Sequence, residues 1–169
     1  MLRSNEAYLF AESAHKGQVR KYTGDPYIVH PCHVADLVLT VTGNVDMYCA
    51  ALLHDTVEDT DTALDDIRIE FGQVVAQYVD WLTDISVPSD GNRATRKAID
   101  CKRLGKAPSE VQTIKLADLI NNSGSILEYD QRFAKVYMEE KRLLLEVLTK
   151  GDKGLHDRAS KIVSDYFAD

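Results

Sequence analysis

One short segment, residues 54–60, gathers more reactive side chains than any other part of the 169-residue chain. It reads His-Asp-Thr-Val-Glu-Asp-Thr and directly follows the apolar run Ala-Ala-Leu-Leu. We expect a helix to carry these side chains out of the core, with Glu58 one turn beyond His54 and Asp55 and on the same side. An imidazole beside a carboxylate can bind a divalent cation, and a carboxylate one turn away can act on water at that cation. An ordinary solvated acidic helix end is the alternative, and the segment alone does not decide between them.

Two other segments favour the metal site. His30 stands immediately before Pro31, where a helix is expected to begin. Asp118 lies in an otherwise apolar helix, where an unpaired charge would be costly. Its expected partner is Lys115, a distant arginine or a metal, and Asn122, one turn further on, is expected to face the same way.

The combined donor set has two imidazole nitrogens and two carboxylates, from His30, His54, Asp55 and Asp118. Such a set suits a borderline-to-hard divalent ion such as manganese, while iron, zinc and nickel stay open. Residues 91–106 add six basic side chains against one acid. This basic stretch could attract a polyanionic nucleotide, or it could be an ordinary solvated helix face.

Helical periodicity predicts the elements that position these residues. Apolar side chains recur at helical spacing in residues 4–14 and 73–85, and the prolines stand at expected helix starts or in loops. We expect a helix from Pro31 to Gly43, one capped by Asp46, a short one ending near Phe71, a longer one from Pro108, and C-terminal helices within residues 131–167. No segment alternates convincingly with period two. The predicted fold class is all-α, a single domain over residues 1–169 built as a bundle of roughly eight to ten helices.

Composition excludes several other functions. The chain has 27 acidic and 20 basic side chains, a net charge of -7, which argues against general nucleic-acid binding. No apolar run approaches membrane-spanning length, so a cytoplasmic location is expected. Cys32, Cys49 and Cys101 lack paired spacing, which disfavours a disulfide scaffold or a thiolate zinc site. Cys49 is expected to be a small buried residue.

The order of these motifs resembles that of the HD-domain metal-dependent phosphohydrolases. More narrowly, it is similar to the hydrolase domain of RelA/SpoT-type alarmone enzymes, especially the free-standing small alarmone hydrolases typified by the metazoan SpoT homologue. The matching segments are 14–18, 20–21, 26–31, 50–60 and 115–118, with Asn122. They define a motif-bearing core over residues 15–122 of an HD-type hydrolase domain, followed by the C-terminal helices.

The resemblance implies roles for individual residues. It implies that one manganese ion per chain is bound by His30, His54, Asp55 and Asp118. It implies that Glu58 and Asp59 orient or deprotonate the attacking water. It further implies nucleotide contacts from Arg20, Lys21, Lys115, Asn122 and Ser125.

The implied activity is that of a manganese-dependent 3′-pyrophosphohydrolase, which hydrolyses (p)ppGpp to GDP or GTP and pyrophosphate. The implied partner is thus a phosphorylated guanine nucleotide. The length leaves no room for a synthetase domain, so degradation without synthesis is expected. The sequence favours neither monomer nor dimer.

One segment departs from the family pattern. After Asp118 the chain reads Leu-Ile-Asn-Asn-Ser-Gly-Ser, without the basic residue and the arginine that family members commonly carry there. Two alternatives therefore stay open: an HD phosphohydrolase acting on another phosphorylated nucleotide, and a catalytically silent nucleotide sensor. The presence of both Glu58 and Asp59 counts against the sensor.

Overall fold

The structure is a computed structural model that describes residues 2–168. Its elements in chain order are α1 (Leu2–Ala14), α2 (Val29–Leu39), α3 (Val45–Leu53), α4 (Thr56–Asp59), α5 (Leu64–Phe71), α6 (Gln73–Leu82), the 3₁₀ turn η1 (Pro88–Asp90), α7 (Arg93–Leu104), α8 (Ser109–Tyr129), α9 (Gln131–Leu145) and α10 (Lys153–Ala168). Within residues 2–168, extended pairing is limited to one isolated bridge between Val19 and Pro26. The all-α prediction is confirmed.

The chain divides into two compact units, with the boundary between Thr83 and Asp84. Each unit is described by itself below. The predicted single domain spans both units and stays a prediction, and its end residues 1 and 169 lie outside the described part. No helix within residues 2–168 has the length and apolar character needed to cross a membrane.

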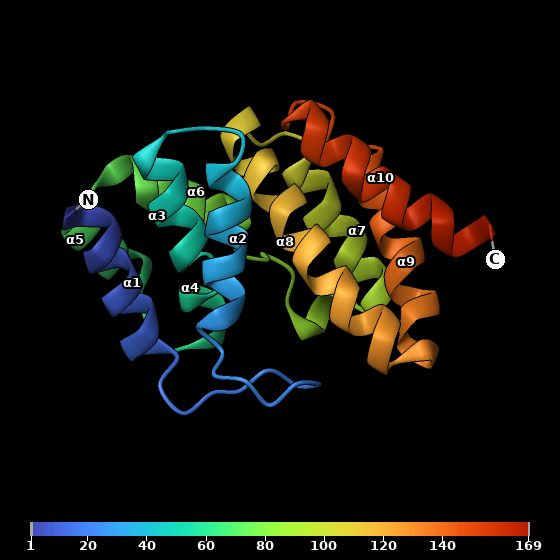
Figure 1. The fold of residues 1–169 in the computed structure, drawn as a ribbon, viewed down its shortest axis with the longest axis horizontal. Coiled ribbons are helices and arrows are strands. Elements are labelled where there is room, and N and C mark those ends of the chain that lie inside the picture. Colours follow the sequence, from blue (N-terminus) through green and yellow to red (C-terminus); the bar gives the residue numbers. More distant parts are fainter. Residues whose placement is uncertain (1, 169) are drawn as a thin grey trace. The chain divides into compact units, whose positions relative to one another are not determined.

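The first unit is organised around α3, which packs against α1, α2 and α6 (Figure 1). Contacts on several sides explain why the sequence of this helix is almost continuously apolar. Its buried side chains are Met47, Cys49, Ala50, Ala51, Leu52 and Leu53. Burial of Cys49 is confirmed, and all three cysteines are free thiols.

Two predicted helix starts are corrected. Asn44, not Asp46, caps α3, because the Asn44 side chain accepts hydrogen bonds from the backbone N–H groups of Asp46 and Met47 at 2.9 and 3.2 Å. The Asp46 carboxylate instead binds Arg3 at 2.7 Å. Helix α2 begins two residues before Pro31 and ends at Leu39, before Gly43. Proline is tolerated in this first turn because its missing N–H would have no intrahelical acceptor.

The single helix predicted through residues 54–59 is interrupted. Helix α3 ends at Leu53, and the short helix α4 begins only at Thr56. Side chains take two carbonyls that a continuing helix would use: His54 Nδ1 lies 2.8 Å from the Ala51 carbonyl, and Thr56 Oγ1 donates to the Leu53 carbonyl at 2.7 Å. The His54–Asp55 pair therefore lies at a break between two helices.

The second unit is built on α8, which packs against α9 and α10, while α7 contacts α9 (Figure 1). The buried Gln112 of α8 links neighbouring segments: its Nε2 donates to the Leu104 carbonyl at 3.0 Å, and its Oε1 accepts from the Lys150 N–H at 2.8 Å. Asp100, the one acid of the basic stretch, is buried and accepts from the N–H groups of Ile85 and Ser86, both at 3.0 Å. The buried polar side chains of Gln112 and Asp100 are thus paired with backbone groups of the same unit.

Alanine substitutions at two glycines of the second unit should change the free energy of unfolding in opposite directions. Gly124 is an exposed residue in the interior of α8, and a Cβ atom added there would meet only open space, so Gly124→Ala should stabilise the protein by about 0.5–1 kcal/mol. At Gly151 a Cβ atom would lie 2.7 Å from Leu116 Cδ1 and 3.1 Å from the Gln112 backbone, so Gly151→Ala should destabilise by roughly 1–3 kcal/mol. Urea unfolding of both variants measures the difference, and equal stability of Gly151→Ala and wild type would contradict the packing described.

Candidate metal centre

Three side chains of the first unit converge. His30 lies in the first turn of α2, His54 follows the last residue of α3, and Asp55 comes next, before α4. One ligand atom from each lies within 4.8 Å of the other two. Asp55 Oδ2 is 3.5 Å from His30 Nε2 and 3.2 Å from His54 Nε2. The two imidazole side chains are 1% and 3% exposed and the carboxylate 19%, so the cluster is sheltered but reachable.

The chemistry of these donors fits a divalent ion. The contact of His54 Nδ1 with the Ala51 carbonyl places the ring proton on Nδ1, because a carbonyl can only accept. This leaves Nε2, the atom facing Asp55, as the ligand nitrogen, the usual arrangement when the second ring nitrogen is held by a carbonyl. Donor atoms about 3 Å apart match neighbouring ligands of an ion whose ligand distances are about 2.0–2.2 Å.

Electrostatics keep the Asp55 carboxylate ionised. Burial raises its pKa, but the neighbouring His54 and His30 outweigh burial and hold the pKa well below its usual range. The Tyr27 hydroxyl donates a hydrogen bond to Asp55 Oδ2 at 2.7 Å. Burial and the charge of Asp55 raise the pKa of Tyr27, so this phenol stays protonated and acts as a donor. Asp55 is thus held in the form and orientation of a ligand.

The two predicted catalytic acids lie on α4. Asp59 Oδ2 is 3.3 Å from the Tyr27 hydroxyl, which brings this carboxylate next to the cluster. Partial burial and the charge of Asp55 raise the pKa of Asp59. Gln18 Nε2 donates to the Asp59 carbonyl at 2.8 Å and so ties α4 to the loop after α1. Glu58 is exposed on the same short helix.

Tyr27 and His15 are two further residues of the centre, and spacing alone does not single out Tyr27. A histidine at a helix end, such as His15, can either support a site or cap carbonyls, and the sequence does not choose between these roles. In the structure His15 is 3% exposed, its ring stacks on that of Tyr27 at 4.6 Å, and its Nδ1 lies 2.8 Å from Gln18 Oε1. His15 therefore supports the centre through Tyr27. The signal for Tyr27 is its position one helical turn before His30, whose ring lies 5.9 Å away.

The two residues of the predicted basic pair, Arg20 and Lys21, contact different aromatic rings. The Arg20 guanidinium lies 5.7 Å from the centroid of the Tyr27 ring, so it borders the cluster. The Lys21 ammonium lies over the ring of Tyr22 at 4.7 Å and donates to its hydroxyl at 3.1 Å. Lys21 thus points along its own loop.

The remaining predicted site residues belong to α8 of the second unit. Asp118 Oδ2 binds Lys115 at 2.9 Å, and Asp118 Oδ1 accepts from Asn122 Nδ2 at 2.6 Å. Of the three partners considered for Asp118, the structure shows Lys115, and the contact with Asn122 confirms that the two side chains share a side of the helix. Ser125 Oγ donates to the Asn122 carbonyl at 3.3 Å, within its own helix. The role of Asp118 as a fourth ligand stays a prediction.

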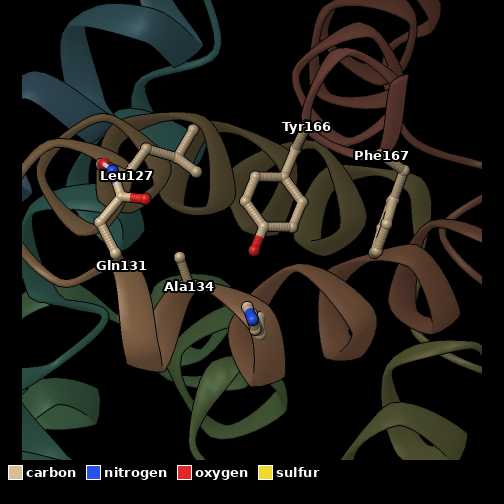
Figure 2. Close-up of a pocket in the computed structure, with 6 residues that line it drawn as sticks. Leu127, Gln131, Ala134, Tyr166 and Phe167 are labelled. Carbon is tan, nitrogen blue, oxygen red and sulfur yellow. Dashed lines mark hydrogen bonds between the residues drawn. The ribbon is translucent and has the colours of Figure 1, made fainter. Parts of the chain in front are cut away.

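Two hollows of the second unit are lined by other residues. Figure 2 shows the smaller, of about 610 Å³, where Tyr166 and Phe167 of α10 face Leu127, Gln131 and Ala134. The larger, of about 940 Å³, runs between α7 and α9 and includes Arg93 and Lys97 of the basic stretch. Neither lining includes Lys115, Asp118, Asn122 or Ser125, so the candidate site is defined by its ligand atoms and not by these hollows.

An all-helical fold with a His and a His-Asp pair converging at a helix break is the arrangement that names the HD class of proteins. The family model described as "HD domain" matches residues 7–141. The chain belongs to this family.

Similarity to individual proteins shows which members of the HD-domain family this chain resembles. The chain is 37% identical over 137 residues to a GTP pyrophosphokinase of Streptomyces coelicolor, a match that covers 80% of this chain and 16% of that protein. It is 38% identical over 120 residues to the guanosine-3′,5′-bis(diphosphate) 3′-pyrophosphohydrolase MESH1 of Homo sapiens, covering 69% of this chain and 65% of that one. It thus spans about a sixth of the long relative and two thirds of the short one.

A solved structure agrees with this placement. A structure described as "A metazoan ortholog of SpoT hydrolyzes ppGpp and plays a role in starvation responses" superposes with a TM-score of 0.89 at 25% identity, covering 98% of this chain and 96% of the other. The chain is therefore homologous to MESH1-type ppGpp hydrolases and to the hydrolase domains of SpoT and RelA proteins.

The contact between Tyr27 and Asp55 generates a prediction about metal affinity. Tyr27→Phe removes the hydroxyl that orients the carboxylate and keeps the ring that packs on His15 and His30. Loss of such a supporting hydrogen bond should weaken divalent-metal binding about 10–100-fold, measured by isothermal titration calorimetry with manganese as the probe. Tyr8→Phe is the matched control, because the Tyr8 hydroxyl bonds only to the exposed Glu12 among the described contacts. Unchanged manganese affinity in Tyr27→Phe would show that Asp55 needs no such support.

Proposed function

We propose that the chain is a manganese-dependent (p)ppGpp 3′-pyrophosphohydrolase, which releases pyrophosphate and returns GDP or GTP in the cytoplasm. The observation that carries the proposal is the convergence of His30, His54 and Asp55, with Asp59 beside them through Tyr27. The homology to proteins named as ppGpp hydrolases supports the choice of substrate.

The proposed ligand set is His30, His54, Asp55 and Asp118. Asp118 is 7% exposed, and its carboxylate suits a cation more than solvent. A bound divalent ion supplies a Lewis acid and makes a nearby water easier to deprotonate. The two imidazoles and the ionised Asp55 provide the charge and the borderline donors that such an ion requires.

The acids of α4 are the proposed proton carriers. A carboxylate with a raised pKa is a better base than an ordinary one, and the pKa of Asp59 is raised. Asp59 or its neighbour Glu58 takes a proton from the water that attacks the 3′ diphosphate. As the bond between phosphorus and the 3′ oxygen breaks, the protonated acid can return the proton to that oxygen.

The proposed substrate contacts are cations and amide or hydroxyl groups. Arg20, Lys21 and Lys115 would balance phosphate charge, which is the main need of a substrate with two diphosphate groups. Asn122 and Ser125 would add neutral hydrogen bonds.

A second candidate, hydrolysis of another phosphorylated nucleotide, is favoured by the segment after Asp118. This segment lacks the family's basic residues, and the Ser125 hydroxyl is occupied by its own helix. Nucleotide selection by this part of α8 is therefore expected to differ from that of long RelA/SpoT enzymes. A manganese-supplemented panel of phosphorylated nucleotides distinguishes the candidates: pyrophosphate from (p)ppGpp supports the first, and orthophosphate from another nucleotide supports the second. Tight nucleotide binding without any product would instead indicate a sensor.

Removal of a proposed ligand should abolish turnover without unfolding the chain. Asp55→Ala and Asp118→Ala each delete a carboxylate, and we expect (p)ppGpp hydrolysis in both to fall to the level seen with EDTA. Product formation is followed by anion-exchange chromatography, and circular dichroism checks that helix content persists. Full activity in either well-folded variant would refute the assignment of that ligand.

Removal of the proposed proton carriers should separate chemistry from metal binding. Asp59→Asn and Glu58→Gln should lower kcat by about 10²–10⁴-fold while manganese affinity stays within a few-fold of wild type. Glu70→Gln on α5 is the control, because Glu70 is another exposed acid of the same unit. If both variants retain wild-type kcat, proton transfer must be assigned to other groups.

A further inference from the structure

Four cations from three helices of the second unit interact with a shared set of carboxylates, those of Asp84, Asp118 and Glu140. Each of three has a carboxylate of its own. Arg93 of α7 binds Glu140 at 2.6 and 2.9 Å, Lys97 of α7 binds Asp84 at 2.6 Å, and Lys115 of α8 binds Asp118 at 2.9 Å. The fourth cation is Lys141 of α9.

Lys141 differs from the other three in its surroundings. Within residues 2–168 its ammonium forms no hydrogen bond or ion pair, and it lies over the ring of Tyr137 at 4.6 Å, one turn earlier on α9. The Tyr137 hydroxyl in turn lies 3.5 Å from the carbonyl of Leu119, the residue after Asp118. The half-buried Lys141 side chain is thus tied to α8 through Tyr137, within electrostatic range of Lys115 and Asp118.

The charges around Lys141 disfavour its cationic form. Burial, followed by the charges of Lys115 and Lys97, lowers the pKa of Lys141 to about 8, although Asp118 and Glu140 act in the opposite direction. A bound anion would relieve this repulsion. If Asp118 serves as a metal ligand, its charge is shared with the metal, and the local excess of positive charge grows.

We propose that Lys141, with Lys115 and Lys97, forms a binding site for a phosphate or diphosphate group on the second unit. Lysine ammonium groups are compact charges that suit phosphate oxygens, and three helices supply one each. Lys141 is the key member, because anion binding costs it no existing ion pair. The inference deepens the proposed function, on which it rests for the identity of the nucleotide that carries the diphosphate.

Competitive acylation tests the site without requiring turnover. The full chain is treated with limiting acetic anhydride at pH 7.5, with manganese at fixed concentration, and modification is quantified by mass spectrometry. With a pKa of about 8, a much larger fraction of Lys141 is neutral and reactive at this pH than of an ordinary lysine, whose pKa is about 10.4. Inorganic pyrophosphate should slow acylation of Lys141 about tenfold, and it should leave Lys135, an exposed lysine of the same helix, unchanged.

Substitutions test the charge itself. Lys141→Met should weaken pyrophosphate binding, measured by calorimetry, by roughly tenfold or more, whereas Lys141→Arg should restore most of the affinity. Lys135→Met is the control and should bind as wild type does. If Lys141→Met fails to fold, the acylation experiment and Lys141→Arg still test the proposal, because the first uses the unsubstituted chain and the second keeps the charge.

The outcomes separate this site from the proposed activity. Protection of Lys141 by pyrophosphate in a chain that hydrolyses no (p)ppGpp would support the anion site and overturn the hydrolase assignment. Hydrolysis of (p)ppGpp with unchanged KM in Lys141→Met, and no protection of Lys141 by pyrophosphate, would overturn the anion site and leave the hydrolase assignment standing. Protection by pyrophosphate with unchanged KM would assign the site to the free anion and overturn its role in holding the nucleotide.

Discussion

The break in the helix at His54 and Asp55 is the feature on which the candidate metal centre depends. Two side chains, His54 and Thr56, bind the carbonyls of Ala51 and Leu53 at the end of the buried helix α3. The same contact that ends the helix also fixes the imidazole proton on Nδ1, so backbone geometry and ligand chemistry are set together. Because α3 is packed on several sides, this end of the helix has little freedom to move.

The centre also shifts the pKa values of two acids, Asp55 and Asp59, in opposite directions. Histidines hold the pKa of Asp55 down, while burial and Asp55 itself raise the pKa of Asp59. One carboxylate is thereby kept as an ionised ligand, and the other becomes a stronger base. Tyr27 lies between them and contacts both, which couples the position of α4 to that of the ligand. Pairs of titratable groups with opposed shifts are typical of acid–base sites.

The sequence predicts most of what is local and little of what is set by tertiary contact. Periodicity predicts the all-α class, and the three-residue spacing of Lys115 and Asp118 makes their ion pair one of the three alternatives considered, since both depend on helix geometry. The predicted continuous helix through residues 54–59 and the predicted Asp46 cap of α3 are wrong, because competing polar side chains stand near each boundary and propensity cannot choose between them. The support from Tyr27 and His15 depends on a loop placed against α4, which no spacing rule contains.

In the second unit, counting charges along the sequence likewise does not show which cations are paired in the fold. The basic stretch has six cations against one acid, yet two of them, Arg93 and Lys97, are neutralised by Glu140 and Asp84 from outside it. Lys141 stands in a segment that reads Glu-Glu-Lys-Arg, and nothing in its sequence marks it. It becomes distinctive only because folding buries its stem beside Lys115 and gives it no carboxylate. The proposed anion site therefore depends on a lysine that folding leaves without a carboxylate partner. A local excess of basic residues in the sequence is a poor guide to such a site.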